Sequence, residues 1–159
     1  MSEQERIRWL IERIRDGYGW HGWDMDKLLE DVTAAEAATT VVPGTHTIWQ
    51  IVEHAIAWRQ VATRRIEGRK VAGPSEQENW PVTPDASESA WAATKAELEA
   101  SRTRFVEAMI RLPATRLNDN VPGEAYTFLD MLYGVLHHDL YHAGQVAVVR
   151  NAVRARAQS

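Results

Sequence analysis

The sequence predicts an all-α protein, a four-helix bundle with one long crossover connection. Three observations lead to this fold class. Apolar residues recur at helical spacing in four long stretches. Helix-capping residues precede these stretches. Runs that alternate between apolar and polar residues and end in turns, which are typical of strands, are scarce. Four long helices joined by shorter segments form a bundle.

The first expected helix begins at the capping box of Ser2 and Glu5 and ends near Asp16, where Gly17 stops it. One face of this helix carries the apolar residues Ile7, Leu10, Ile11 and Ile14. Residues 17–23 then combine three glycines with three aromatic residues. Such a mixture favours a bend in which large side chains lie close to backbone.

Two short helices should follow, one capped by Asp24 and the other by Thr33, before a break at residues 41–44. A capping box that begins at Thr47 opens a long helix. This second long helix should end near Gly68, because glycine readily adopts the conformation that terminates helices.

Residues 69–86 are rich in Pro, Gly, Ser and Asn, which indicates a surface crossover. Asp85 should cap the third long helix, which ends before Pro113. Thr127 should cap the fourth, with a tail that frays after Ala152. The crossover allows the second and fourth long helices to lie side by side.

Composition restricts the class of protein. The 159 residues are expected to form one domain (1–159), because this length can bury a core without disulfides or other cross-links. The net charge is −4 and no sustained Lys/Arg block occurs, so we expect no nucleic-acid partner. No run of 18 apolar residues exists and the first residues are charged, so we expect a cytoplasmic protein with no membrane contact. The chain has no cysteine, which leaves His, Asp and Glu as metal ligands.

Histidines interrupt the apolar faces of two predicted helices. His138 and His142 are four residues apart on the last helix, so both rings can reach one metal ion. His54 interrupts the apolar face of the second long helix in the same way. Spacing alone also fits imidazoles that bond a buried carboxylate or carbonyl group. Three inward histidines on two helices favour a shared metal ion, held by His54, His138 and His142.

Other metal classes fit the sequence less well. A gluzincin needs Glu after the first His of its motif, but Asp139 follows His138. A di-iron bundle needs paired Glu-x-x-His motifs, and a bis-His haem needs ligands on opposite sides of the ring. A mononuclear site with an open position therefore remains. Zinc or nickel is favoured, with iron or manganese as alternatives, although imidazole ligands alone do not select the metal.

Two segments also carry a family resemblance. They are residues 43–58, Pro-Gly-Thr-His-Thr-Ile-Trp-Gln-Ile-Val-Glu-His-Ala-Ile-Ala-Trp, and residues 138–145, His-Asp-Leu-Tyr-His-Ala-Gly-Gln. The chain resembles the DinB/YfiT-like metalloprotein superfamily, whose members place one His on the second long bundle helix and a His-x-x-x-His pair on the last. This resemblance implies a four-helix bundle, a divalent metal held by His54, His138 and His142, and a homodimer. Characterised relatives include metal-dependent thiol S-transferases that use bacillithiol or mycothiol.

The expected function is therefore a metal-dependent thiol S-transferase-like activity on a small electrophile, with a low-molecular-weight thiol as partner. A thiol that coordinates the metal loses its proton, so the protein needs no nucleophile of its own. Two alternatives stay open. One is a non-catalytic, stress-associated bundle that binds a metal or a small molecule. The other is a metal-dependent hydrolase, which requires a nearby general base.

His21 and Gln145 are the two candidate catalytic residues. His21 lies among aromatic residues and can line the pocket mouth as a proton donor or substrate contact, or else pack in the loop against Trp. Gln145 can hydrogen-bond near the site, or else satisfy a helix interface. Asp139 projects about 100° away from His138, which favours an inter-helix or solvated role at least as much as an orienting one. His137 is expected on the surface.

Overall fold

The computed structural model describes residues 1–15, 20, 22–83 and 85–158. Within this part of the chain the elements in order are α1 (Glu3–Arg15), α2 (Met25–Leu29), α3 (Ala34–Ala38), α4 (Ile48–Ile66), α5 (Glu76–Asn79), α6 (Glu88–Arg111), the 3-10 turn η1 (Ala114–Arg116) and α7 (Phe128–Ala157). The same residues contain no β-strand, so the prediction of an all-α protein is confirmed. None of these helices is both long enough and apolar enough to pass through a membrane.

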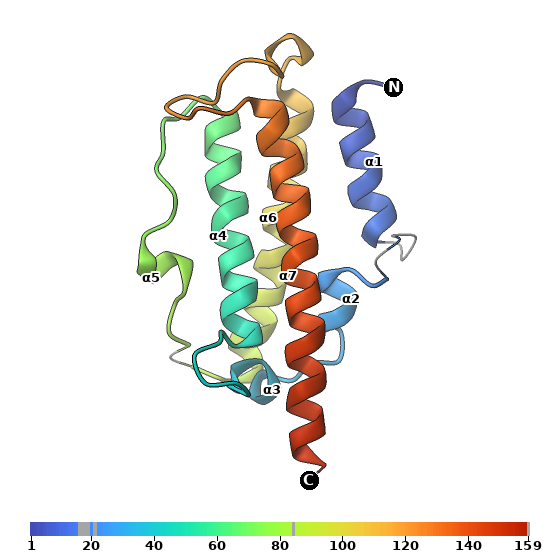
Figure 1. The fold of residues 1–159 in the computed structure, drawn as a ribbon, viewed down its shortest axis with the longest axis vertical. Coiled ribbons are helices and arrows are strands. Elements are labelled where there is room, and N and C mark those ends of the chain that lie inside the picture. The colour runs from blue at the N-terminus through green and yellow to red at the C-terminus, as the bar shows by residue number, and fades with distance from the viewer. Residues whose placement is uncertain (16–19, 21, 84, 159) are drawn as a thin grey trace.

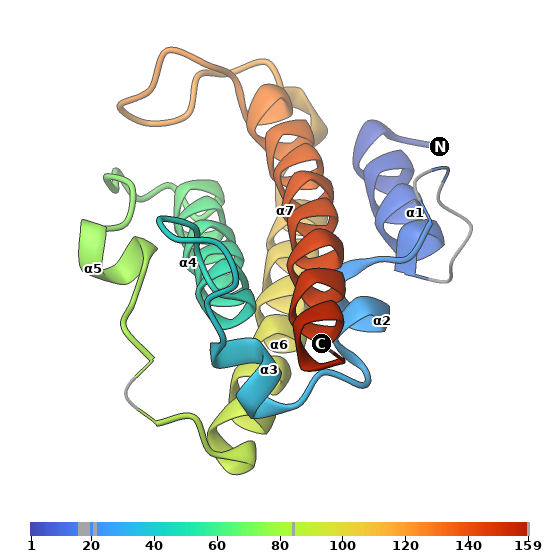
Figure 2. The same cartoon turned by 60° about the horizontal axis from the view of Figure 1, so that its bottom comes forward.

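The four long helices form a bundle. Figure 1 shows α4, α6 and α7 side by side, with α1 beside α7. The connection from α4 to α6 carries α5 along the outer side of α4, as Figure 2 also shows. The predicted crossover is therefore present. It leaves α4 and α7 in direct contact, running in opposite directions.

Two apolar clusters fill the bundle, and polar groups lie between them. One cluster includes Trp91 and Val52 near α3, and the other includes Phe105 and Phe128 at the opposite end. On α4 the first cluster reaches Ile56 and the second begins at Ala62. On α7 the corresponding limits are Ala143 and Leu132. The middle of the α4–α7 contact is thus the place where the core admits polar side chains.

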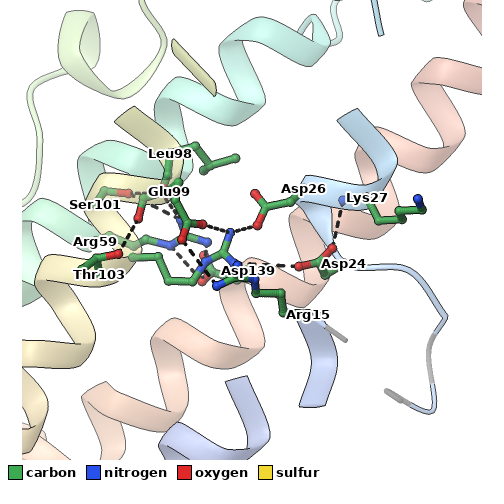
Figure 3. A network of polar contacts seen from close by, with 11 residues as sticks. Arg15, Asp24, Asp26, Lys27, Arg59, Leu98, Glu99, Ser101, Thr103 and Asp139 are labelled. Atoms are coloured by element: carbon green, nitrogen blue, oxygen red, sulfur yellow. Dashed lines mark hydrogen bonds and ion pairs between the residues drawn. The ribbon is translucent and has the colours of Figure 1, made fainter. Parts of the chain in front are cut away.

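A network of charged groups occupies part of this middle layer (Figure 3). Arg59 of α4 is 4% exposed, and its Nε and Nη2 atoms lie 3.0 and 2.9 Å from Oδ2 of Asp139 on α7. Its Nη1 donates to the carbonyl of Leu98 on α6 at 3.0 Å. Arg102 of α6 pairs with Asp26 of α2. Asp139 therefore has the inter-helix role, and the network joins α2, α4, α6 and α7.

The start of α6 differs from the prediction. Ser87, and not Asp85, is the N-cap, because the Ser87 hydroxyl accepts the amide hydrogen of Ala90 at 3.2 Å. Asp85 instead accepts hydrogen bonds from the amide and hydroxyl of Ser87. Both residue types cap helices well. The capping box predicted at Thr47 and the cap predicted at Thr127 are both present, and each forms both reciprocal hydrogen bonds of a capping box.

The predicted fraying after Ala152 is wrong, because α7 continues to Ala157. Arg154 holds this end of the helix in place: its Nε lies 2.8 Å from Glu36 and its Nη1 lies 3.0 Å from Asp31. These ion pairs join α7 to α3 and to the loop before it. The predicted end of α4 near Gly68 is confirmed, since Gly68 follows the helix with φ of +87°.

Candidate metal site

Three histidines meet at the contact between α4 and α7. His54 comes from α4, and His138 and His142 come from successive turns of α7. Nε2 of His138 lies 3.0 Å from Nε2 of His54 and 3.1 Å from Nε2 of His142. One ring nitrogen from each residue lies within 4.8 Å of the other two. The structure therefore brings together the three histidines that the sequence predicted as metal ligands.

Hydrogen bonds fix the orientation of two of these rings. Nδ1 of His54 lies 3.3 Å from the backbone carbonyl of Asn79, and Nδ1 of His142 lies 2.7 Å from Oε1 of Gln145. Both partners are acceptors, so each Nδ1 carries the hydrogen and each Nε2 presents a lone pair to the cluster. The amide nitrogen of Gln145 donates to the Tyr141 hydroxyl at 3.0 Å, which orients its oxygen toward His142. Gln145 therefore fixes the orientation of the His142 ring.

The surroundings keep the imidazoles neutral. Burial is the main cause that lowers the pKa of His54 to about 4 and that of His138 to about 3, with His142 as the next contributor to both. Burial also lowers the pKa of His142. Neutral imidazole is the form that binds metal ions. At pH 7 all three rings are in this form.

The contacts between the three nitrogens fit a shared cation. Nε2 of His54 and Nε2 of His142 both act as acceptors, and His138 could donate its single Nε2 hydrogen to one of them only. A divalent ion would accept all three lone pairs. Tetrahedral ligands at the usual zinc–nitrogen distance lie about 3.3 Å apart, close to the observed 3.0 and 3.1 Å. These residues could therefore hold a metal ion.

Aromatic rings cover one side of the cluster. Trp80, from the crossover after α5, stacks on His54 with ring centroids 4.0 Å apart, and His46 stacks on Trp80 at 3.5 Å. Trp58 meets the edge of His138 at 6.3 Å and donates to the Asn79 side chain at 3.0 Å. The crossover thus holds the His54 ring in place and covers this side of the cluster.

The other candidate residues, and the carboxylate that adjoins His54 in sequence, lie in different places. His21 lies outside the described residues. His137 is exposed on α7, as predicted, and its ring stacks on that of Tyr133. The Glu53 carboxylate, next to His54 in sequence, accepts a hydrogen bond from Thr94 of α6 at 3.0 Å. Glu53, like Asp139, therefore takes part in a contact between two helices.

Sequence reasoning missed two contributions to the site. The carbonyl of Asn79 comes from the last residue of the four-residue helix α5, and the ring of His46 comes from the loop before α4. Neither segment is long enough or regular enough for a periodic pattern to indicate direction. The Trp80-Pro81 pair in the crossover is the one local signal of an anchor there. It does not reveal that His54 is the residue to which the crossover is anchored.

Because the pKa values of His54 and His138 are low, we expect a divalent metal bound at this site to be retained in mildly acidic solution. Protons compete with metal only as the pH falls toward the ligand pKa, so loss should begin below about pH 5 and not at the ordinary histidine pKa of 6.5. Dialysis at pH 7, 6, 5 and 4, followed by metal analysis and circular dichroism, checks this. Loss of half the metal by pH 6 would contradict it.

Replacing Gln145 by leucine should weaken metal binding about 10- to 100-fold, because His142 loses the acceptor that fixes its ring. Glutamate at this position keeps an acceptor oxygen and should restore most of the affinity. Competition with a chelator of known affinity measures both variants. If the leucine variant and the unchanged protein bound the metal with equal affinity, Gln145 would not be needed to position His142.

A family model described as the DinB superfamily matches residues 20–146 of the sequence. This range includes all three histidines of the cluster. No curated protein and no solved structure matched the sequence.

Proposed function

Because the chain belongs to the DinB superfamily, we propose that it is a metal-dependent enzyme that transfers a low-molecular-weight thiol to a small electrophile. The observation that carries this proposal is the convergence of His54, His138 and His142 on one point between α4 and α7. Only these three ligand groups gather there among the described residues, which favours a site with room for substrate over a closed structural one.

The proposed cofactor is a divalent ion held by the three Nε2 atoms, with zinc or nickel ahead of iron or manganese. When bound, such an ion lowers the pKa of a coordinated thiol, so that the thiolate exists at neutral pH. The chain has no cysteine, so the thiol is a substrate and not a side chain.

The chain's own residues hold and enclose the reactants. Asn79 and Gln145 fix the direction of two ligand rings, and Trp80 and Trp58 limit access of water. In the proposed reaction a bond forms between the thiol sulfur and the electrophilic carbon. The leaving group departs with its electron pair, and the thiol proton passes to solvent.

Hydrolysis is the weaker alternative. A hydrolase with this ligand set needs a general base that can reach the attacking water. The two carboxylates adjacent in sequence to the ligands, Glu53 and Asp139, face Thr94 and Arg59 instead. These contacts favour a reaction in which the thiol substrate, and not an activated water molecule, supplies the nucleophile.

The test is a conjugation assay. Protein loaded separately with zinc, nickel, iron or manganese is incubated with cysteine, bacillithiol or mycothiol and with 1-chloro-2,4-dinitrobenzene, and the thioether is quantified by mass spectrometry. At least one metal should raise the rate more than about tenfold above the metal-free protein, because a free thiol is only a few per cent thiolate at pH 7 and coordination raises this fraction. His142→Ala should lose this increase, and His137→Ala, on the same helix, should keep it. The absence of any metal-dependent conjugate would refute the proposal.

A further inference from the structure

An apolar pocket of about 250 Å³ lies along the α4–α7 contact, directly beside the histidine cluster. Its wall includes Trp58 and Val61 from α4 and Met131 and Val135 from α7. His138 also lines it, so one ring of the metal site forms part of the pocket surface. A ligand in this pocket would therefore contact the site itself.

Among the residues that the structure describes, none in the wall of this pocket offers an unpaired positive charge to a ligand. Arg65 lies in its wall, but its Nε and Nη2 atoms donate to the carbonyl of Val71 at 3.3 and 3.1 Å. Its guanidinium also pairs with Glu124 and donates to the Tyr126 hydroxyl. The other charged residue of the wall is Asp130, whose carboxylate is negative. An anionic ligand would thus find no free cation and would meet a negative charge.

The volume of the pocket indicates the size of the ligand that it can hold. An engineered apolar cavity of about 150 Å³ in another protein binds benzene. A pocket of about 250 Å³ is large enough for one substituted aromatic ring.

We propose that this pocket binds the uncharged aromatic part of the electrophilic substrate, with the reacting carbon at the end formed by His138. The assignment of the ligand as an electrophile rests on the proposed function. The binding of a neutral aromatic compound does not, because the pocket wall is defined by the protein alone.

Two glycines of α7 provide a matched pair of variants. Gly134 lines this pocket, and Gly144 lines a different pocket further along α7. A Cβ atom added at either position meets no other atom within 4 Å. Leucine at position 134 should therefore fill the pocket, whereas leucine at position 144 should leave it open. Both changes favour the helix, because glycine is a poor helix former.

The binding test uses metal-free protein and 1,3-dinitrobenzene, a neutral aromatic compound without a leaving group, in equilibrium dialysis. The unchanged protein and Gly144→Leu should bind this probe alike, and Gly134→Leu should bind it at least tenfold more weakly. The anion 3,5-dinitrobenzoate should bind the unchanged protein at least tenfold more weakly than the neutral probe. Circular dichroism checks folding, and Gly134→Met serves as the second variant if Gly134→Leu does not fold.

Equal binding of the neutral probe by the unchanged protein and a folded Gly134 variant would overturn the pocket assignment. So would equal binding of the neutral and anionic probes. The conjugation assay with metal-loaded protein separates the two proposals. Probe binding that is lost in Gly134→Leu, without any metal-dependent conjugation, would leave the pocket in place and refute the transferase. Conjugation that is unchanged in Gly134→Leu would refute the pocket and leave the transferase.

Discussion

Replacing His142 by alanine is expected to abolish stoichiometric binding of a divalent metal. His142 supplies one of three converging Nε2 atoms, and no fourth ligand group joins them among the described residues to take its place. Changes to the residues that orient a ligand typically cost 10- to 100-fold in affinity, and the loss of a ligand itself should cost more than about 100-fold. His54→Ala should have the same effect from the other helix.

The measurement is metal analysis of protein purified without an affinity tag that carries nickel. The control is His137→Ala, which removes an exposed imidazole one residue from His138 and should keep the full metal content. Circular dichroism separates loss of metal from loss of fold. If His54→Ala or His142→Ala retained one equivalent of metal, the assigned ligand set would be wrong.

The three histidines of the cluster were predictable because helix geometry fixes the direction of each side chain locally. The spacing of His138 and His142 places both rings on one side of α7, and the apolar pattern around His54 shows that it faces inward. The capping boxes at Thr47 and Thr127 locate the starts of both helices in the same way, through contacts across only three residues.

Features that depend on the path of the chain were not predictable. The carbonyl of Asn79 reaches His54 only because the crossover folds back along α4, and loop residues carry no period that would indicate this. The end of α7 is stabilised by the contacts of Arg154 with Asp31 and Glu36, more than one hundred residues away in sequence. Gln145 lies between these cases. Its proximity to His142 follows from helix spacing. The spacing does not show that its side-chain oxygen accepts a hydrogen bond from Nδ1 of His142.

Replacing Arg59 by methionine is expected to destabilise the protein by about 3 kcal/mol, the lower end of the range for removing one partner of a buried ion pair. Arg59 is 4% exposed, and the two nitrogens it presents to Asp139 both contact Oδ2. The other oxygen, Oδ1, is buried without a partner, so removal of Arg59 would leave the whole carboxylate unpaired. The Leu98 carbonyl would remain satisfied, because Ser101 also donates to it at 2.7 Å.

Urea unfolding of the metal-free protein measures this cost, since bound metal would itself add to the free energy of unfolding. The double variant Arg59→Met, Asp139→Leu should recover most of the lost stability, because it removes both charges and leaves apolar side chains in contact. Arg104→Met is the matched control on α6. The side chains of Arg104 and its partner Glu97 are 47% and 41% exposed, so this ion pair is accessible to water and its loss should cost less than about 1 kcal/mol. If Arg59→Met costs no more than Arg104→Met, the network of Figure 3 does not hold the middle of the bundle together.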